Sequence, residues 1–60
     1  MTGEELRELR ESLGATQEEI AHYLGLSHKS QVAHLEKGRT KIRGPKLKLL
    51  LELKISGKFR

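Results

Sequence analysis

Three residues, Gly25, Leu26 and Ser27, are all that clearly separate two segments with helical patterning, residues 17–24 and 28–37. The first segment ends at Gly25, a residue suited to the left-handed backbone that closes many helices. A connection this short forces the two helices to cross at a large angle, because it is too short for them to lie antiparallel. The chain is therefore expected to fold around this angled helix pair.

Local signals predict where the other helices begin and end. Thr2 with Glu5, and Thr16 with Glu19, form capping boxes in which each side chain binds the other residue's backbone N–H. The third helix has two candidate N-cap residues, Ser27 and Ser30, which leave its start uncertain by about three residues. The chain is expected to be a single domain, residues 1–60, with an all-α fold of four helices over about 3–13, 17–24, a stretch within 28–37, and 45–55.

Composition agrees with a small helical bundle and excludes other classes. Eleven of the 60 residues are leucine, one is Tyr, one is Phe and none is Cys. Strands favour β-branched and aromatic side chains, so a chain this rich in leucine and poor in aromatic residues is more typical of helices. The absence of cysteine excludes disulfides and Cys-ligated metals. Stability must then come from helix packing, caps or a second subunit. No apolar run approaches the roughly 18 residues of a membrane span, so a cytoplasmic protein with no membrane partner is expected.

Charge is divided unequally along the chain. Residues 1–26 hold six Glu against two Arg, a balance of −4, and residues 27–60 hold ten Lys or Arg against two Glu, a balance of +8. A basic half on a small domain suits a polyanion such as DNA. The alternative, which charge alone leaves open, is a solvated lysine-rich helix.

The stretch TQEEIAHYLGLSHKSQVAHLEKG, residues 16–38, resembles the phage repressor and Cro-like helix-turn-helix family (lambda repressor-like domain). The resemblance covers about residues 4–53. The chain departs from the family pattern at the turn. In the family, the first core aliphatic residue of the third helix comes six residues after the turn glycine. Here Val32 is seven residues after Gly25, so one extra residue lies in the turn or at the start of the third helix. The matching positions are Thr16, Gln17, Ala21, Gly25, Leu26, Ser27, Val32, Glu36 and Gly38.

This resemblance implies a sequence-specific transcription regulator, expected to be a repressor of phage, mobile-element or antitoxin type, that reads double-stranded operator DNA through the helix near residues 28–37. It implies a structural ion pair between Arg10 and Glu36. The residues implied to contact bases in the major groove are Lys29, Ser30 and His34, with Gln31 added if the extra residue shifts the frame. Those implied to contact phosphates are Gln17, Arg39, Lys41 and Arg43.

The fourth helix is apolar on nearly all sides, which predicts more than one packing surface. At 100° per residue, Leu47, Leu51 and Ile55 share one arc, and this arc is expected to face the core. Leu49 and Leu53 lie across from it and are expected to form a homodimer interface. The alternative function is a protein–protein interaction module that uses this helix and binds DNA weakly or not at all.

Other chemistry finds little support in the sequence. His22, His28 and His34 are six residues apart, which places successive imidazoles about 120° apart even on an unbroken helix, so no metal site is expected. The glutamates of the first helix form a solvated face without a cleft, and no nucleophile has a base at a credible position. The protein is therefore expected to be no enzyme, to need no cofactor and to bind no small-molecule ligand.

Overall fold

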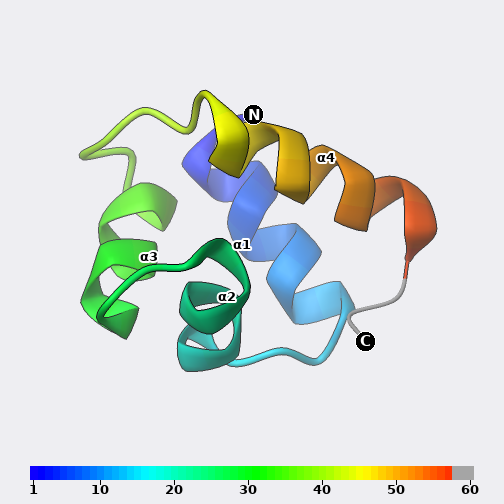
Figure 1. Ribbon diagram of the computed structural model, residues 1–60, viewed down its shortest axis with the longest axis horizontal. Helices are drawn as coiled ribbons and strands as arrows, with labels where there is room; N and C mark the ends of the chain where they lie inside the picture. Colours follow the sequence, from blue (N-terminus) through cyan, green and yellow to red (C-terminus); the bar gives the residue numbers. More distant parts are fainter. Residues whose placement is uncertain (58–60) are drawn as a thin grey trace.

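The computed structural model describes residues 1–57, and in that range it contains four α-helices and no strand. The helices are α1 (Gly3–Ser12), α2 (Gln17–Leu24), α3 (Lys29–Glu36) and α4 (Pro45–Ser56). Figure 1 shows α1 in the middle of the fold, between α4 and the angled pair formed by α2 and α3. The predicted all-α fold of four helices is confirmed.

One core joins the four helices. Leu6, Ile20, Val32 and Leu50 are the largest fully buried side chains, and each comes from a different helix. Among the helices, α3 packs most closely against α2 and also against α1. The recognition segment predicted from the sequence is therefore held from two sides by the rest of the domain.

The predicted capping boxes set the starts of α1 and α2. The Thr2 hydroxyl accepts a hydrogen bond from the backbone N–H of Glu5, and the backbone N–H of Thr2 donates to the Glu5 carboxylate. Thr16 and Glu19 form the same two hydrogen bonds. Gly25 closes α2 with φ of +74°, a left-handed conformation that favours glycine. These local signals give helix boundaries within one residue of those predicted.

The start of α3 differs from both alternatives that the sequence left open. The N-cap position is held by His28, so neither Ser27 nor Ser30 occupies it, and α3 begins at Lys29. The extra residue therefore lies in the turn, not in the helix. Lys29 and Ser30 become the first two helical residues, and Val32 and Leu35 face the core.

The rotation of α4 also differs from the prediction. Leu50 and Leu53 are buried, whereas Leu51 is 43% exposed and Ile55 is 86% exposed. The prediction that Leu53 faces a partner and Leu51 and Ile55 face the core was therefore wrong. Leu49 is only partly buried and packs against the core. Its carbonyl accepts a hydrogen bond of 3.4 Å from the Tyr23 hydroxyl of α2.

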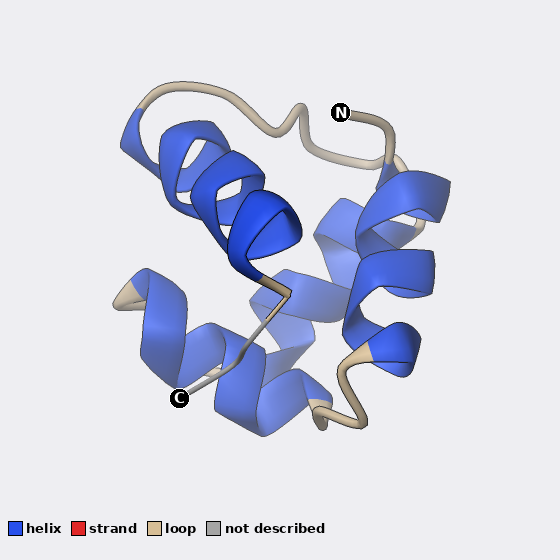
Figure 2. Cartoon of the chain, turned by 90° about the vertical axis from the view of Figure 1, so that its right-hand side faces the viewer, coloured by secondary structure: helices blue, strands red, loops and turns tan. Residues whose placement is uncertain are grey.

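A long basic segment, residues 37–44, connects α3 to α4 (Figure 2). Ile42 is the buried residue of this segment, with 8% of its surface exposed. Its neighbours Lys41 and Arg43 are exposed, as is Arg39. A buried aliphatic side chain thus attaches the segment to the core, and the cations on either side of it stay in solvent.

Candidate nucleic-acid interface

The exposed side of α3 carries polar side chains in a fixed frame. Lys29, Ser30 and His34 are exposed, and the intervening Val32 is fully buried. Ser30 and His34 are four residues apart and leave the helix on the side that Val32 does not use, whereas Lys29, three residues before Val32, lies nearer the buried side in the exposed first turn. These are three of the residues for which the resemblance implies base contacts.

Gln31, the fourth of those residues, has a different local role. Its Oε1 accepts hydrogen bonds from the backbone N–H groups of Ser27 at 3.0 Å and His28 at 3.2 Å. The side chain folds back over the start of α3. The sequence suggested Gln31 as a base contact if the extra residue shifts the frame, and in the structure its amide oxygen is bound to the turn.

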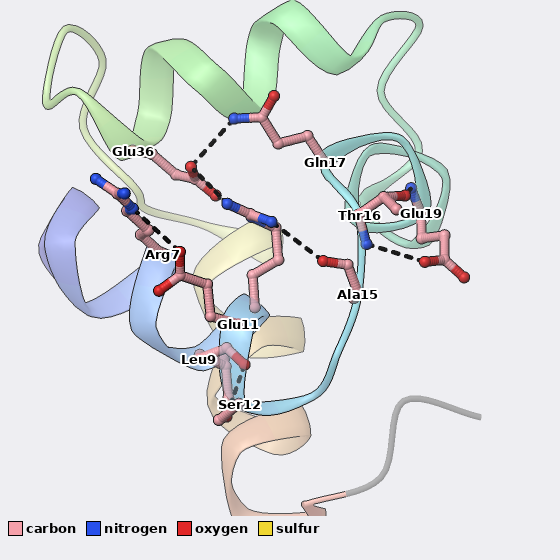
Figure 3. A network of polar contacts seen from close by, with 10 residues as sticks. Arg7, Leu9, Glu11, Ser12, Ala15, Thr16, Gln17, Glu19 and Glu36 are labelled. Carbon is pink, nitrogen blue, oxygen red and sulfur yellow. Dashed lines mark hydrogen bonds and ion pairs between the residues drawn. The ribbon is translucent and has the colours of Figure 1, made fainter.

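The C-terminal end of α3 is attached to α1 by an ion pair. Arg10 Nε donates to Glu36 Oε2 at 2.6 Å, and Arg10 Nη2 donates to Glu36 Oε1 at 3.4 Å. Arg10 Nη1 also donates to the Ala15 carbonyl at 3.1 Å, which ties in the connection between α1 and α2. The two charged side chains are only 16% and 7% exposed. Figure 3 shows the Glu36 carboxylate at the centre of this network.

Gln17 belongs to the same network. Its Nε2 donates to Glu36 Oε1 at 3.2 Å, and Figure 3 shows the two side chains pointing toward each other. The sequence suggested a phosphate contact for Gln17, but its nearest partner in the protein is a carboxylate that already binds Arg10. No local pattern predicts this contact, because residues 17 and 36 are far apart in the sequence.

A close backbone approach brings the start of α1 against the end of α3. A Cβ atom on Gly3 would lie 2.3 Å from the Leu35 carbonyl oxygen and 2.5 Å from that of Glu36. Only glycine fits at this position without moving one of the two helices. Sequence reasoning missed this role, because a glycine at the start of a helix carries no signal of a distant neighbour.

Two further charged residues lie beside the exposed side of α3 and were not predicted. Lys46, in the first turn of α4, lines a hollow together with Gln31 and His34. Glu18, in the first turn of α2, lines hollows together with Lys29. Lys46 adds a positive charge beside His34, whereas the Glu18 carboxylate beside Lys29 would repel phosphates.

Three further observations concern titration, metal binding and membrane insertion. The pKa of the Glu5 carboxyl is lowered, chiefly because the backbone N–H of Thr2 binds the ionised form at 2.9 Å. Over residues 1–57, no three His, Cys, Asp or Glu side chains are grouped so that they could hold a metal ion. Within the same range, none of the helices has the length and apolar character needed to cross a membrane.

An angled pair of short helices, with the second held by the core and exposing polar side chains, defines a helix-turn-helix domain, whose second helix enters the major groove. Residues 6–53 match the family model described as helix-turn-helix. The chain thus belongs to the helix-turn-helix family, of the phage repressor and Cro-like type, and is a DNA-binding transcription regulator. Comparison with curated proteins and with solved structures gives no match.

Proposed function

We propose that this protein is a sequence-specific repressor that reads operator DNA through the exposed side of α3. The observation that carries the proposal is the set Lys29, Ser30 and His34, exposed on a helix whose other side is buried in the core. A Lys side chain suits the O6 and N7 acceptors of guanine, and Ser can serve several bases. The resemblance favours a regulator of phage, mobile-element or antitoxin type.

The basic segment after α3 is proposed to bind the flanking phosphates. Arg39, Lys41 and Arg43 are exposed there, and Gln17 is proposed to add a contact from the start of α2. If each subunit of a dimer neutralises three or four phosphates, the slope of log K against log salt is expected to be about −5 to −7. A slope near zero would contradict DNA binding altogether.

Base contacts and phosphate contacts can be separated by mutation. A preferred duplex is first selected from a random library with the parent protein, and its binding is compared with that of a scrambled duplex by fluorescence anisotropy. His34→Ala is expected to reduce the preference by up to about 1 kcal/mol, the low end for a base contact. Arg43→Ala is expected to weaken binding to both duplexes alike.

The matched control for Arg43 is Arg7→Ala, which removes the same charge from an exposed position on α1. It is expected to weaken binding much less than Arg43→Ala, because the long-range effect of one surface charge is screened by salt. Equal effects of the two variants would show that only net charge matters. Uniform weakening of both duplexes by His34→Ala would show that α3 does not read bases.

We also propose that the protein binds DNA as a homodimer, and that the two subunits contact each other through the exposed apolar side chains of α4. Leu51 and Ile55 are the exposed large hydrophobic residues of the described range, and they lie four residues apart on one side of the helix. This surface replaces the Leu49 and Leu53 interface expected from the sequence. Two subunits would present paired recognition helices to major grooves about 34 Å apart.

Sedimentation equilibrium tests this interface. The double variant Leu51→Lys/Ile55→Lys is expected to be monomeric at concentrations where the parent protein associates, and Lys54→Ala is the control on the same helix. Association that is equal in the double variant and the parent would place the interface elsewhere. A parent protein that stays monomeric and binds no duplex would favour the alternative, a module in which α4 binds a different protein.

A further inference from the structure

The turn that leads into α3 is held closed by one side chain. Gln31 Oε1 receives the backbone N–H groups of both Ser27 and His28, at 3.0 and 3.2 Å. In the opposite direction, the backbone N–H of Gln31 donates to the His28 carbonyl at 3.1 Å. Three hydrogen bonds therefore connect Gln31 to the two residues immediately before the helix.

This arrangement accommodates a turn that is one residue longer than the family pattern. A Ser at the N-cap would normally bind the first free N–H groups of the helix through its hydroxyl. Here the N-cap position has moved to His28. The amide of Gln31, at the third helical position, holds the N-cap backbone as the Glu or Gln of a capping box does.

The same contacts make Gln31 a poor reader of bases. A glutamine that reads adenine uses its oxygen to accept from N6 and its nitrogen to donate to N7. The oxygen of Gln31 is already bound to two backbone donors. Giving it to a base would release both N–H groups of the turn.

We propose that Gln31 is a positioning residue that fixes where α3 begins, and thereby holds Lys29 and Ser30 in the frame that faces DNA. The inference rests on the proposed DNA-reading function of α3. Val32 follows Gln31 directly and is fully buried, so it anchors one side of the first helical turn while Gln31 anchors the connection before it. Without the Gln31 amide oxygen, the backbone N–H groups of Ser27 and His28 lose the hydrogen bonds that hold the turn before α3 in position.

The first test needs no DNA. The backbone amides of Ser27 and His28 are followed by two-dimensional NMR and hydrogen exchange in the parent protein, Gln31→Ala and Gln31→Glu. Gln31→Ala is expected to shift both amides and speed their exchange. Gln31→Glu is expected to keep them protected, since a carboxylate accepts the same two hydrogen bonds. Unchanged Ser27 and His28 amides in Gln31→Ala would overturn the proposal.

The second test uses the selected and scrambled duplexes. Gln31→Ala is expected to lose about five- to tenfold of its affinity for the selected duplex, the effect of one helix cap, and less for the scrambled duplex. Adding His28→Ser to this variant supplies a hydroxyl at the N-cap and is expected to restore most of the preference. A mutation that only destabilised the fold would weaken binding to both duplexes by the same factor.

The outcomes separate positioning from base reading. If Gln31→Ala changes the preferred base at one position and His28→Ser does not restore it, Gln31 reads that base and the proposal is wrong. Equal weakening of both duplexes without rescue would also overturn it. If the parent protein binds no selected duplex, the proposed function fails, whereas the Ser27 and His28 amides still decide whether Gln31 fixes the start of α3.

Discussion

Removing the Arg10 guanidinium should cost this protein a large part of its folding free energy. The group makes three hydrogen bonds, two to Glu36 and one to the Ala15 carbonyl. In Arg10→Met the Glu36 carboxylate, whose side chain is 7% exposed, would keep only the Gln17 amide as a partner among residues 1–57. Breaking a buried ion pair by removing one partner costs about 3–5 kcal/mol, because the other charge is left without compensation.

The cost of removing Arg10 is large compared with the total free energy of unfolding. A domain of this length has an expected unfolding free energy of about 3–9 kcal/mol, at roughly 0.05–0.15 kcal/mol per residue. Arg10→Met is therefore expected to be largely or wholly unfolded in moderate urea. The double variant Arg10→Met/Glu36→Met removes the stranded charge as well and is expected to recover much of the loss, since apolar replacements of buried pairs are often close to neutral.

Urea unfolding followed by circular dichroism at 222 nm measures both effects. The chain offers a matched control in the exposed pair Arg7–Glu11, whose Nε–Oε2 distance is 3.4 Å and whose side chains are 63% and 56% exposed. Arg7→Met is expected to cost less than about 1 kcal/mol, as for other surface pairs. Equal costs for Arg7→Met and Arg10→Met, or a double variant less stable than Arg10→Met, would refute the argument from burial.

Three other perturbations have expected results. Gly3→Ala should destabilise the protein by about 1–3 kcal/mol in urea unfolding, since the new Cβ would overlap the Leu35 carbonyl, although alanine usually favours a helix; a gain in stability would contradict the close approach. Glu18→Gln should tighten binding to every duplex at low salt, and the gain should fade as salt rises, because it removes a carboxylate beside Lys29. The lowered pKa of Glu5 means that its capping contribution is present at neutral pH and is lost as pH falls from its unfolded pKa through its folded pKa. Glu5→Gln should therefore flatten the acid side of a stability–pH curve, and an unchanged curve would argue against the cap.

The sequence by itself determined the parts of this protein that depend on contacts within a few residues. Capping boxes act over three positions, so Thr2 and Thr16 predicted the starts of α1 and α2. Gly25 predicted the end of α2 for the same reason. The short connection after it required an angled pair of helices, and the spacing of residues around it was enough to identify the family.

Only the tertiary structure decided which side of α4 is buried. Leucines at 47, 49, 50, 51 and 53 leave hardly any side of the helix polar, so helical periodicity alone allows several rotations of nearly equal burial. Contacts with other helices select among them, including the Tyr23 hydroxyl bound to the Leu49 carbonyl. The result buries Leu50 and Leu53 and exposes Leu51 and Ile55.

The start of α3 was decided in the same way. Ser27 and Ser30 are both good N-cap residues, and local preference did not choose between them. The buried position of Val32 and the return of the Gln31 side chain to the turn place the cap at His28 instead. A good N-cap side chain contributes about 1 kcal/mol, whereas full burial of a side chain such as Val32 contributes about 1.5–3 kcal/mol, so packing of the helix against the core outweighs the cap preference.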